Sequence, residues 1–228
     1  MARSLFIVLT TAAFTLVPSF IPLTSAAIID EIPQSFEVNA KYLFYLHGKI
    51  IEDQGPRPTH PTHGAYEYLR ILNVFSEKGF TVVSEVREAG TDIQEYARRV
   101  DEQVRMLLAG GVPPQNITVV GASKGAMIAA EVSGLLQNRA VHFVMLAGCS
   151  KEAMAHWKER GISFSGKVLS IYDSIDSYAC SCAPMFERSS PEQLGMHEEV
   201  VLSLGLGHGF FYRPLPDWVD PVVAWSGK

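Results

Sequence analysis

A serine flanked by glycines is the residue in this sequence best placed to act as a nucleophile. Gly121-Ala122-Ser123-Lys124-Gly125 follows an apolar run that ends at Val120 and precedes residues with helical spacing. Small residues on both sides of such a serine let a strand turn sharply into a helix and leave the hydroxyl exposed. The pattern predicts a nucleophile at Ser123; the alternative is a tight strand-to-helix turn with a passive serine.

A serine hydroxyl is a weak nucleophile near neutral pH and needs a base that takes its proton. Among the seven histidines, His208 lies between glycines in a segment that follows the last predicted strand. We therefore expect His208 to reach over Ser123 as the base. His60 and His63 lie in a proline-rich loop without a Cys or carboxylate at ligand spacing, so we expect a solvated or packing role there and no metal.

The base in turn needs a carboxylate that orients it. The predicted strand from Val168 to Tyr172 is followed by two acids, Asp173 and Asp176. A turn after a strand tends to direct its third or fourth residue toward the site, while its first acid bonds the turn's own backbone. These tendencies favour Asp176 as the catalytic acid, with Asp173 as the alternative.

Backbone N–H groups near Ser123 could stabilise a developing oxyanion. Gly48 ends the first strand and begins a long loop, and Lys124 directly follows the nucleophile. We expect the N–H groups of Gly48 and Lys124 to form the oxyanion hole; the alternative for Gly48 is an ordinary turn. The Lys124 side chain could attract an anionic substrate or lie in solvent.

These residues must be positioned by a scaffold, and short apolar runs alternate with helical patterns along the chain. This alternation predicts an α/β domain with a mostly parallel sheet of about six strands and helices on both faces. Between Cys149 and Gly166 there is room for one crossover helix and not for a cap domain. The predicted strands cover 41–47, 80–86, 116–120, 141–146, 167–172 and 199–204, and helices are predicted near 68–78, 92–110, 124–136 and 216–225.

The first 26 residues have the layout of a secretory signal peptide, with Arg3, an apolar run and small residues before Ala27. An uncleaved anchor is the alternative, but Pro18 and Pro22 interrupt the apolar stretch. We expect an exported protein, periplasmic or secreted, with a domain over 27–228 and no stable membrane anchor after cleavage. Cleavage removes one Arg and no acid, so the net charge changes from −5 to 18 − 24 = −6, a poor match for nucleic acid.

The order Ser123, Asp176, His208 is the triad order of the α/β-hydrolase superfamily. The stretch from Tyr42 to Trp225 resembles a small, capless group of exported α/β-hydrolases, which carry Leu-His-Gly after the first strand, Gly-Ala-Ser-Lys-Gly at the serine turn, Ser-Ile-Tyr before the acid and Gly-His-Gly near the end. The resemblance implies a Ser-His-Asp triad and a backbone oxyanion hole, and acyl transfer by such a triad needs no metal or organic cofactor.

The function implied is carboxylesterase-like hydrolysis of a small-molecule ester through an acyl-enzyme on Ser123. The alternatives are a serine peptidase and a non-catalytic ligand-binding protein on the same fold. The superfamily acts on many acyl compounds, so neither the physiological substrate nor the oligomeric state follows from the resemblance.

The resemblance also bears on the three cysteines, because export permits disulfides. Cys149 ends one strand and Cys182 follows the next, so a bridge between them would brace the acid loop and leave Cys180 spare. A bridge between Cys180 and Cys182 is disfavoured by its geometry. Three unpaired thiols are the alternative.

Overall fold

The computed structural model describes residues 26–228. The predicted signal peptide lies outside these residues apart from its last one, Ala26. None of the helices in the described part of the chain is long and apolar enough to cross a membrane.

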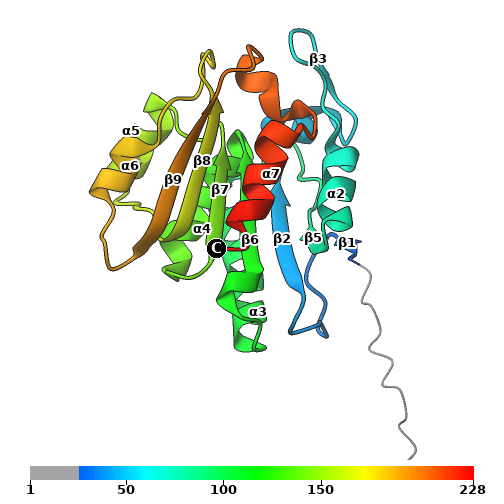
Figure 1. The fold of residues 1–228 in the computed structure, drawn as a ribbon, viewed down its shortest axis with the longest axis vertical. Coiled ribbons are helices and arrows are strands. Elements are labelled where there is room, and N and C mark those ends of the chain that lie inside the picture. The colour runs from blue at the N-terminus through cyan, green and yellow to red at the C-terminus, as the bar shows by residue number, and fades with distance from the viewer. Residues whose placement is uncertain (1–25) are drawn as a thin grey trace, which may run out of the picture.

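Strands and helices alternate along the chain, as the sequence pattern predicts (Figure 1). The strands are β1 Ile28–Ile29, β2 Lys41–Leu46, β3 Thr59–His60, β4 Gly64–Ala65, β5 Phe80–Val83, β6 Ile117–Ala122, β7 His142–Leu146, β8 Gly166–Asp173 and β9 Leu194–Leu202. The helices are α1 Lys49–Gln54, α2 Tyr68–Glu77, α3 Ile93–Ala109, α4 Lys124–Leu136, α5 Lys151–Glu159, α6 Ala183–Arg188 and α7 Pro216–Trp225, with short 3₁₀ turns η1 Pro114–Asn116 and η2 Gly207–Tyr212.

Seven strands form one sheet in the order β1-β5-β2-β6-β7-β8-β9, and every neighbouring pair is parallel. The predicted fold class is confirmed, but the expected strand number was one too low. The additional strand is β1, which pairs Ile28 and Ile29 with Val82 and Val83. Two residues are too few to show the period-2 pattern from which strands are recognised in a sequence.

Both faces of the sheet are buried along its central strands β2, β6 and β7, as is typical of a parallel sheet. Along β2, Tyr42, Phe44 and Leu46 join the core under α3 and α4, while Leu43 and Tyr45 join the core under α2 and α7. Figure 1 shows α2 and α7 on one side of the sheet and α3 and α4 on the other. Within residues 26–228 no separate cap domain is formed, and the short β3–β4 ribbon and the loop after β8 lie beside the pocket described below.

Several segments differ from the sequence-based expectation, among them β9, which is predicted over 199–204 and spans Leu194–Leu202. The strand predicted over 80–86 ends at Val83, because the chain then leaves the sheet and carries Arg87 beneath His47. The loop predicted after the first strand contains α1 and β3. Helix α1 has only six residues, a length at which helical periodicity is weak evidence.

Two histidines in the core make stability depend on pH. Burial, aided by the charge of Arg87, lowers the pKa of His47 to about 3. Burial, aided by the charge of Lys167, lowers the pKa of His142 to about 4. In the unfolded chain both have a pKa near 6.5, so from pH 6.5 down to about 4 the unfolded state binds more protons. Stability is therefore lost as the pH falls through this window.

We expect the free energy of unfolding to fall by about 2 kcal/mol between pH 6 and pH 5, about half of it from each histidine. The variant His142→Leu should lose about half of this pH dependence, because it leaves only His47 to be protonated on unfolding. Urea unfolding followed by tryptophan fluorescence at both pH values measures the difference. An unchanged slope in the variant would contradict the assignment.

Candidate active site

Ser123 lies at a strained turn between β6 and α4, with φ 52° and ψ −116°. Glycines on both sides make this turn possible. A Cβ atom at Gly121 would lie 2.2 Å from the carbonyl oxygen of Gly125, and one at Gly125 would lie 1.8 Å from the carbonyl oxygen of Leu46. Positive φ in a non-glycine residue marks strain that the surrounding packing must maintain. The close packing of α4 against β6 and the end of β2 fixes the serine in this conformation.

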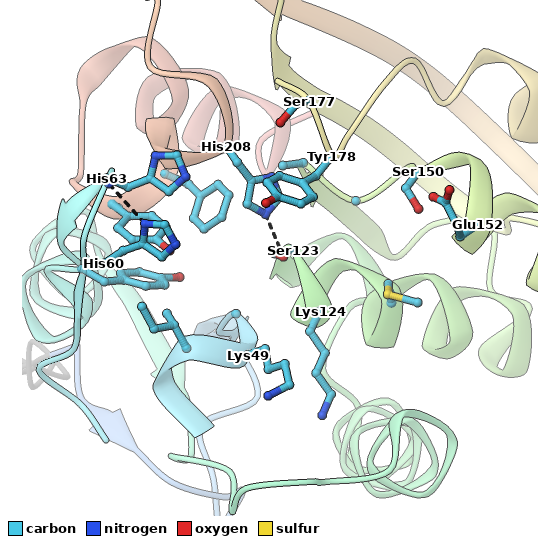
Figure 2. A pocket seen from close by; sticks show the side chains of 18 of the residues that line it. Lys49, His60, His63, Ser123, Lys124, Ser150, Glu152, Ser177, Tyr178 and His208 are labelled. Atoms are coloured by element: carbon cyan, nitrogen blue, oxygen red, sulfur yellow. Dashed lines mark hydrogen bonds between the residues drawn. The ribbon is translucent and has the colours of Figure 1, made fainter. Parts of the chain in front are cut away.

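The structure brings Ser123, His208 and Asp176 into one hydrogen-bonded line, and Figure 2 shows the His208–Ser123 part of it. His208 Nε2 lies 2.9 Å from Ser123 Oγ, and His208 Nδ1 lies 2.9 Å from Asp176 Oδ2. The side chain of Asp176 is fully buried and that of His208 is 16% exposed. A carboxylate only accepts hydrogen bonds, so the proton of the neutral imidazole lies on Nδ1 and Nε2 is free to accept the serine proton.

Asp176 is held as a carboxylate by its surroundings. Its Oδ1 accepts the N–H groups of Tyr178 at 2.8 Å and Ala179 at 3.0 Å. Burial by itself raises the pKa of the Asp176 carboxyl, but the hydrogen bond from His208 and these two N–H groups outweigh it and hold the pKa below its usual range. The group that orients His208 is therefore ionised near neutral pH.

Asp173, the alternative acid, is also buried but points elsewhere. Its Oδ1 accepts the N–H of Ile175 at 3.1 Å, and its Oδ2 accepts those of Leu204 at 3.1 Å and Leu206 at 3.2 Å. These hydrogen bonds hold the turn after β8 against the segment that precedes η2. Asp173 thus supports the loops that carry Asp176 and His208.

The segment after β2 lies beside the nucleophile. A Cβ atom at Gly48 would be 3.6 Å from the Cβ of Ser123, and Gly48, Lys49 and Lys124 all line the same pocket as Ser123. The Lys124 ammonium is not free to meet an anionic substrate, because it donates to Glu52 Oε2 at 2.6 Å and to the Thr91 carbonyl oxygen at 2.7 Å.

A pocket of about 790 Å³ opens at Ser123. One wall is formed by His60 and His63, whose rings stack with centroids 4.5 Å apart (Figure 2). His63 also packs closely against the segment that carries His208, since a Cβ atom at Gly209 would be 2.8 Å from its ring. Sequence reasoning gave these histidines no part in the site. The sequence places both histidines in the loop after β2, at the carboxyl edge of the sheet. Because parallel sheets bind ligands at this edge, that position could have indicated a role in the pocket.

A disulfide joins Cys149, just after β7, to Cys182, just before α6. Cys180 is the free cysteine among the described residues, and its N–H donates to the Cys149 carbonyl oxygen at 2.7 Å. The bridge joins the end of the loop that carries Asp176 to the segment that follows β7. It therefore braces the part of the chain that carries Asp176.

This fold, a parallel sheet with helices on both faces and a serine turn between β6 and α4, is the α/β-hydrolase fold. The structure is similar to a phospholipase/carboxylesterase from Dyadobacter fermentans, with a TM-score of 0.54 and 14% identity over 87% of this chain and 94% of that one. It is also similar to a 2,6-dihydroxy-pseudo-oxynicotine hydrolase, with a TM-score of 0.53 and 15% identity over 85% of this chain and 62% of that one. No protein-family model and no curated protein matches the chain.

Proposed function

We propose that this protein is a serine hydrolase that cleaves esters of small molecules through an acyl-enzyme on Ser123. The observation that carries the proposal is the hydrogen-bonded line from Ser123 through His208 to Asp176 at the base of an open pocket. The arrangement has the geometry of the triad that drives acyl transfer on unrelated folds, and this geometry supports the proposal.

The first half of the reaction forms the acyl-enzyme. Ser123 Oγ attacks the carbonyl carbon of the ester while His208 Nε2 takes the hydroxyl proton, which gives a tetrahedral oxyanion and an imidazolium. Asp176 stabilises the imidazolium that forms. The intermediate collapses as the carbon–oxygen bond to the alcohol breaks, and His208 returns the proton to the departing alkoxide oxygen.

The oxyanion is assigned to backbone N–H groups of Lys124 and of the loop at Gly48. Lys124 is the first residue of α4, and N–H groups in a first helical turn have no acceptor within their helix. The Gly48 carbonyl accepts the N–H of Ile51 at 3.2 Å, along the axis of α1. The N–H of Lys49, on the opposite side of the same planar trans peptide, therefore points out of α1 and adds a donor beside Gly48.

The second half of the reaction regenerates the serine. A water molecule attacks the acyl carbon while His208 Nε2 takes one of its protons, and the second tetrahedral intermediate collapses with return of that proton to Ser123 Oγ. The products are a carboxylic acid and the free enzyme. Every proton transfer in this scheme uses His208.

We further propose that the mature chain begins near Ala27, from the layout of the first 26 residues, and works outside the cytosol, either in a periplasm or as a secreted protein; the disulfide supports the second part. Structural disulfides persist in oxidising compartments and are rare in the cytosol.

The proposed function is tested by treating the purified protein with a fluorophosphonate probe and by assaying short-chain nitrophenyl esters. We expect the probe to label Ser123, located by peptide mass spectrometry, and Ser123→Ala to abolish both labelling and ester turnover. Ester turnover that persists in Ser123→Ala, or an unlabelled serine in the folded parent, would count against the proposal. Faster cleavage of matched amides would favour a peptidase, and ligand binding without turnover would favour a binding protein.

A further inference from the structure

Three charged side chains that take no part in the proton transfers form a cluster next to the nucleophile, two of them buried and the third, Lys124, partly exposed. Glu52 of α1 is 0% exposed, Arg87 after β5 is 1% exposed, and Lys124 is 14% exposed. Arg87 Nε donates to Glu52 Oε1 at 2.8 Å, and Lys124 Nζ donates to Glu52 Oε2 at 2.6 Å. One carboxylate therefore holds two cations, one on each side of the site.

Arg87 contacts the segment around Gly48 and Lys49, and Lys124 is itself the first residue of α4. These are the two segments to which the oxyanion donors are assigned. Arg87 Nη2 donates to the His47 carbonyl oxygen, and the Arg87 backbone N–H donates to His47 Nε2 at 3.0 Å. With Nε2 accepting, the imidazole proton lies on Nδ1, which donates to the Gly48 carbonyl oxygen at 3.0 Å. Arg87 thereby fixes the backbone just before Lys49.

Lys124 fixes the other segment, because its own backbone N–H is the donor at the start of α4. Its ammonium also donates to the Thr91 carbonyl oxygen, which anchors α4 to the loop before α3. On the opposite side, the loop after β2 is in contact with Gly125, where a Cβ atom would lie 2.8 Å from the His47 carbonyl oxygen. The loop is thus confined between α4 and Arg87.

A buried charged cluster of this kind contributes little to the stability of the fold compared with apolar side chains. Removing charges from water costs free energy that ion pairing often does not recover, and apolar side chains of similar volume commonly give a protein at least as stable. Arg87 Nη1 has no hydrogen-bond partner, but the other hydrogen bonds of the cluster each have a required direction and together fix its geometry. Oxyanion stabilisation depends on donors held in place before the charge develops.

We propose that Glu52 is a positioning residue: through Arg87 and Lys124 it sets the position of the Gly48–Lys49 backbone relative to the N–H of Lys124 and so shapes the oxyanion hole. This inference rests on the proposed function of Ser123. The hydrogen-bond partners of the Glu52 carboxylate are Arg87 and Lys124, so Glu52 contacts no reacting atom and no side chain of the proposed triad.

The test compares Glu52→Gln with Glu131→Gln. Glu131 is a matched control, because it is a buried glutamate that accepts from Arg160 Nη1 at 2.6 Å and lies on α4, two turns beyond the nucleophile. We expect Glu52→Gln to lower kcat for a nitrophenyl ester about 10- to 100-fold with KM changed less than about threefold, since the donors are displaced and not removed. Glu131→Gln should leave kcat within about twofold of the parent, with any stability loss seen in thermal unfolding.

A second readout reports on the oxyanion hole directly. A trifluoromethyl ketone forms a tetrahedral adduct on the serine whose oxygen occupies the position of the oxyanion, so its affinity should weaken in Glu52→Gln by about the same factor as kcat/KM falls. The pH profile of kcat/KM should keep its shape, because the triad is unchanged. Amide hydrogen exchange of residues 47–51 should become faster in Glu52→Gln and stay unchanged in Glu131→Gln.

If Glu52→Gln is poorly folded, the double variant Glu52→Gln with Lys124→Met is compared with the parent instead. It removes one negative and one positive charge, so the net charge of the cluster is unchanged. It should be more stable than the single variant and still have the low kcat. Equal kcat and inhibitor affinity in Glu52→Gln and Glu131→Gln would overturn the positioning role while ester turnover in the parent upholds the proposed function. A parent protein without turnover or labelling at Ser123 would overturn both.

Discussion

Asp176→Asn is expected to lower kcat/KM about 10⁴-fold without unfolding the protein, the size of effect that the wrong imidazole tautomer has in Ser-His-Asp triads. The asparagine amide can donate to His208 Nδ1 and thereby place the imidazole proton on Nε2, where it can no longer accept the proton of Ser123. Because Asp176 also accepts the N–H groups of Tyr178 and Ala179, a moderate loss of stability should accompany the loss of activity. Steady-state kinetics with a nitrophenyl ester and thermal unfolding measure the two effects.

The matched control is Asp173→Asn, which changes the other acid of the same turn. Asp173 accepts three backbone N–H groups and does not contact His208. In Asp173→Asn the side-chain NH₂ group would point at one or more of these N–H groups, and two donors cannot form a hydrogen bond. We expect about 1–3 kcal/mol of lost stability and kcat within about tenfold of the parent for the folded fraction. A larger kinetic effect at Asp173 than at Asp176 would show that the acid of the triad is assigned to the wrong residue.

Gly125→Ala is expected to cost more than about 4 kcal/mol or to prevent folding altogether. The added Cβ atom would lie 1.8 Å from the Leu46 carbonyl oxygen and 2.8 Å from that of His47, both of them backbone atoms next to the oxyanion loop. Leu46 lies in a central strand of the sheet and Gly125 lies in the turn that holds Ser123. Moving either backbone would therefore cost much free energy. Any folded fraction should also have lost activity, since α4 would be pushed away from β2.

Gly134→Ala provides the comparison on the same helix. There the added Cβ atom would lie 3.2 Å from a methyl group of Ile162 and 3.3 Å from the Ser163 carbonyl oxygen, contacts that a small shift relieves. Alanine also has a higher helix propensity than glycine by about 1 kcal/mol. We expect a net effect within about 1 kcal/mol. Equal costs at the two positions, measured by urea unfolding, would show that the close approach at Gly125 is not what the fold depends on.

The parts of the fold that could be predicted from the sequence are those with a strong local signal. Strand β6 is a continuous apolar run, and the turn at Ser123 requires glycines at fixed spacing, so both follow from a few adjacent residues. Helix α7 was predicted with the bounds that the structure has, because a proline at its start and buried residues at helical spacing mark it clearly. The proximity of His208 to Ser123 followed from topology, since parallel strands bring their carboxyl ends to one edge.

The parts that were missed depend on contacts between residues far apart in the chain. Glu52 lies 35 residues from Arg87 and 72 from Lys124, and no local pattern links them. Charged side chains are mostly exposed, so the sequence predicts for Lys124 an ammonium in solvent or facing an anionic substrate, and not one bonded to Glu52. The pocket wall at His60 and His63 was missed for a similar reason, because its rings are ordered by packing against Tyr212 and Gly209.

The disulfide has a consequence for how the protein matures. It closes a loop with a sequence separation of 33 residues that contains the whole of β8 and Asp176. Closing a loop of this length reduces the conformational freedom of the unfolded chain by an amount equivalent to about 3–4 kcal/mol. A newly made chain in a reducing environment lacks this contribution, and the segment that carries the acid gains its full stability only when the two thiols are oxidised. The proposed activity would thus depend on whether the chain folds where this disulfide can form.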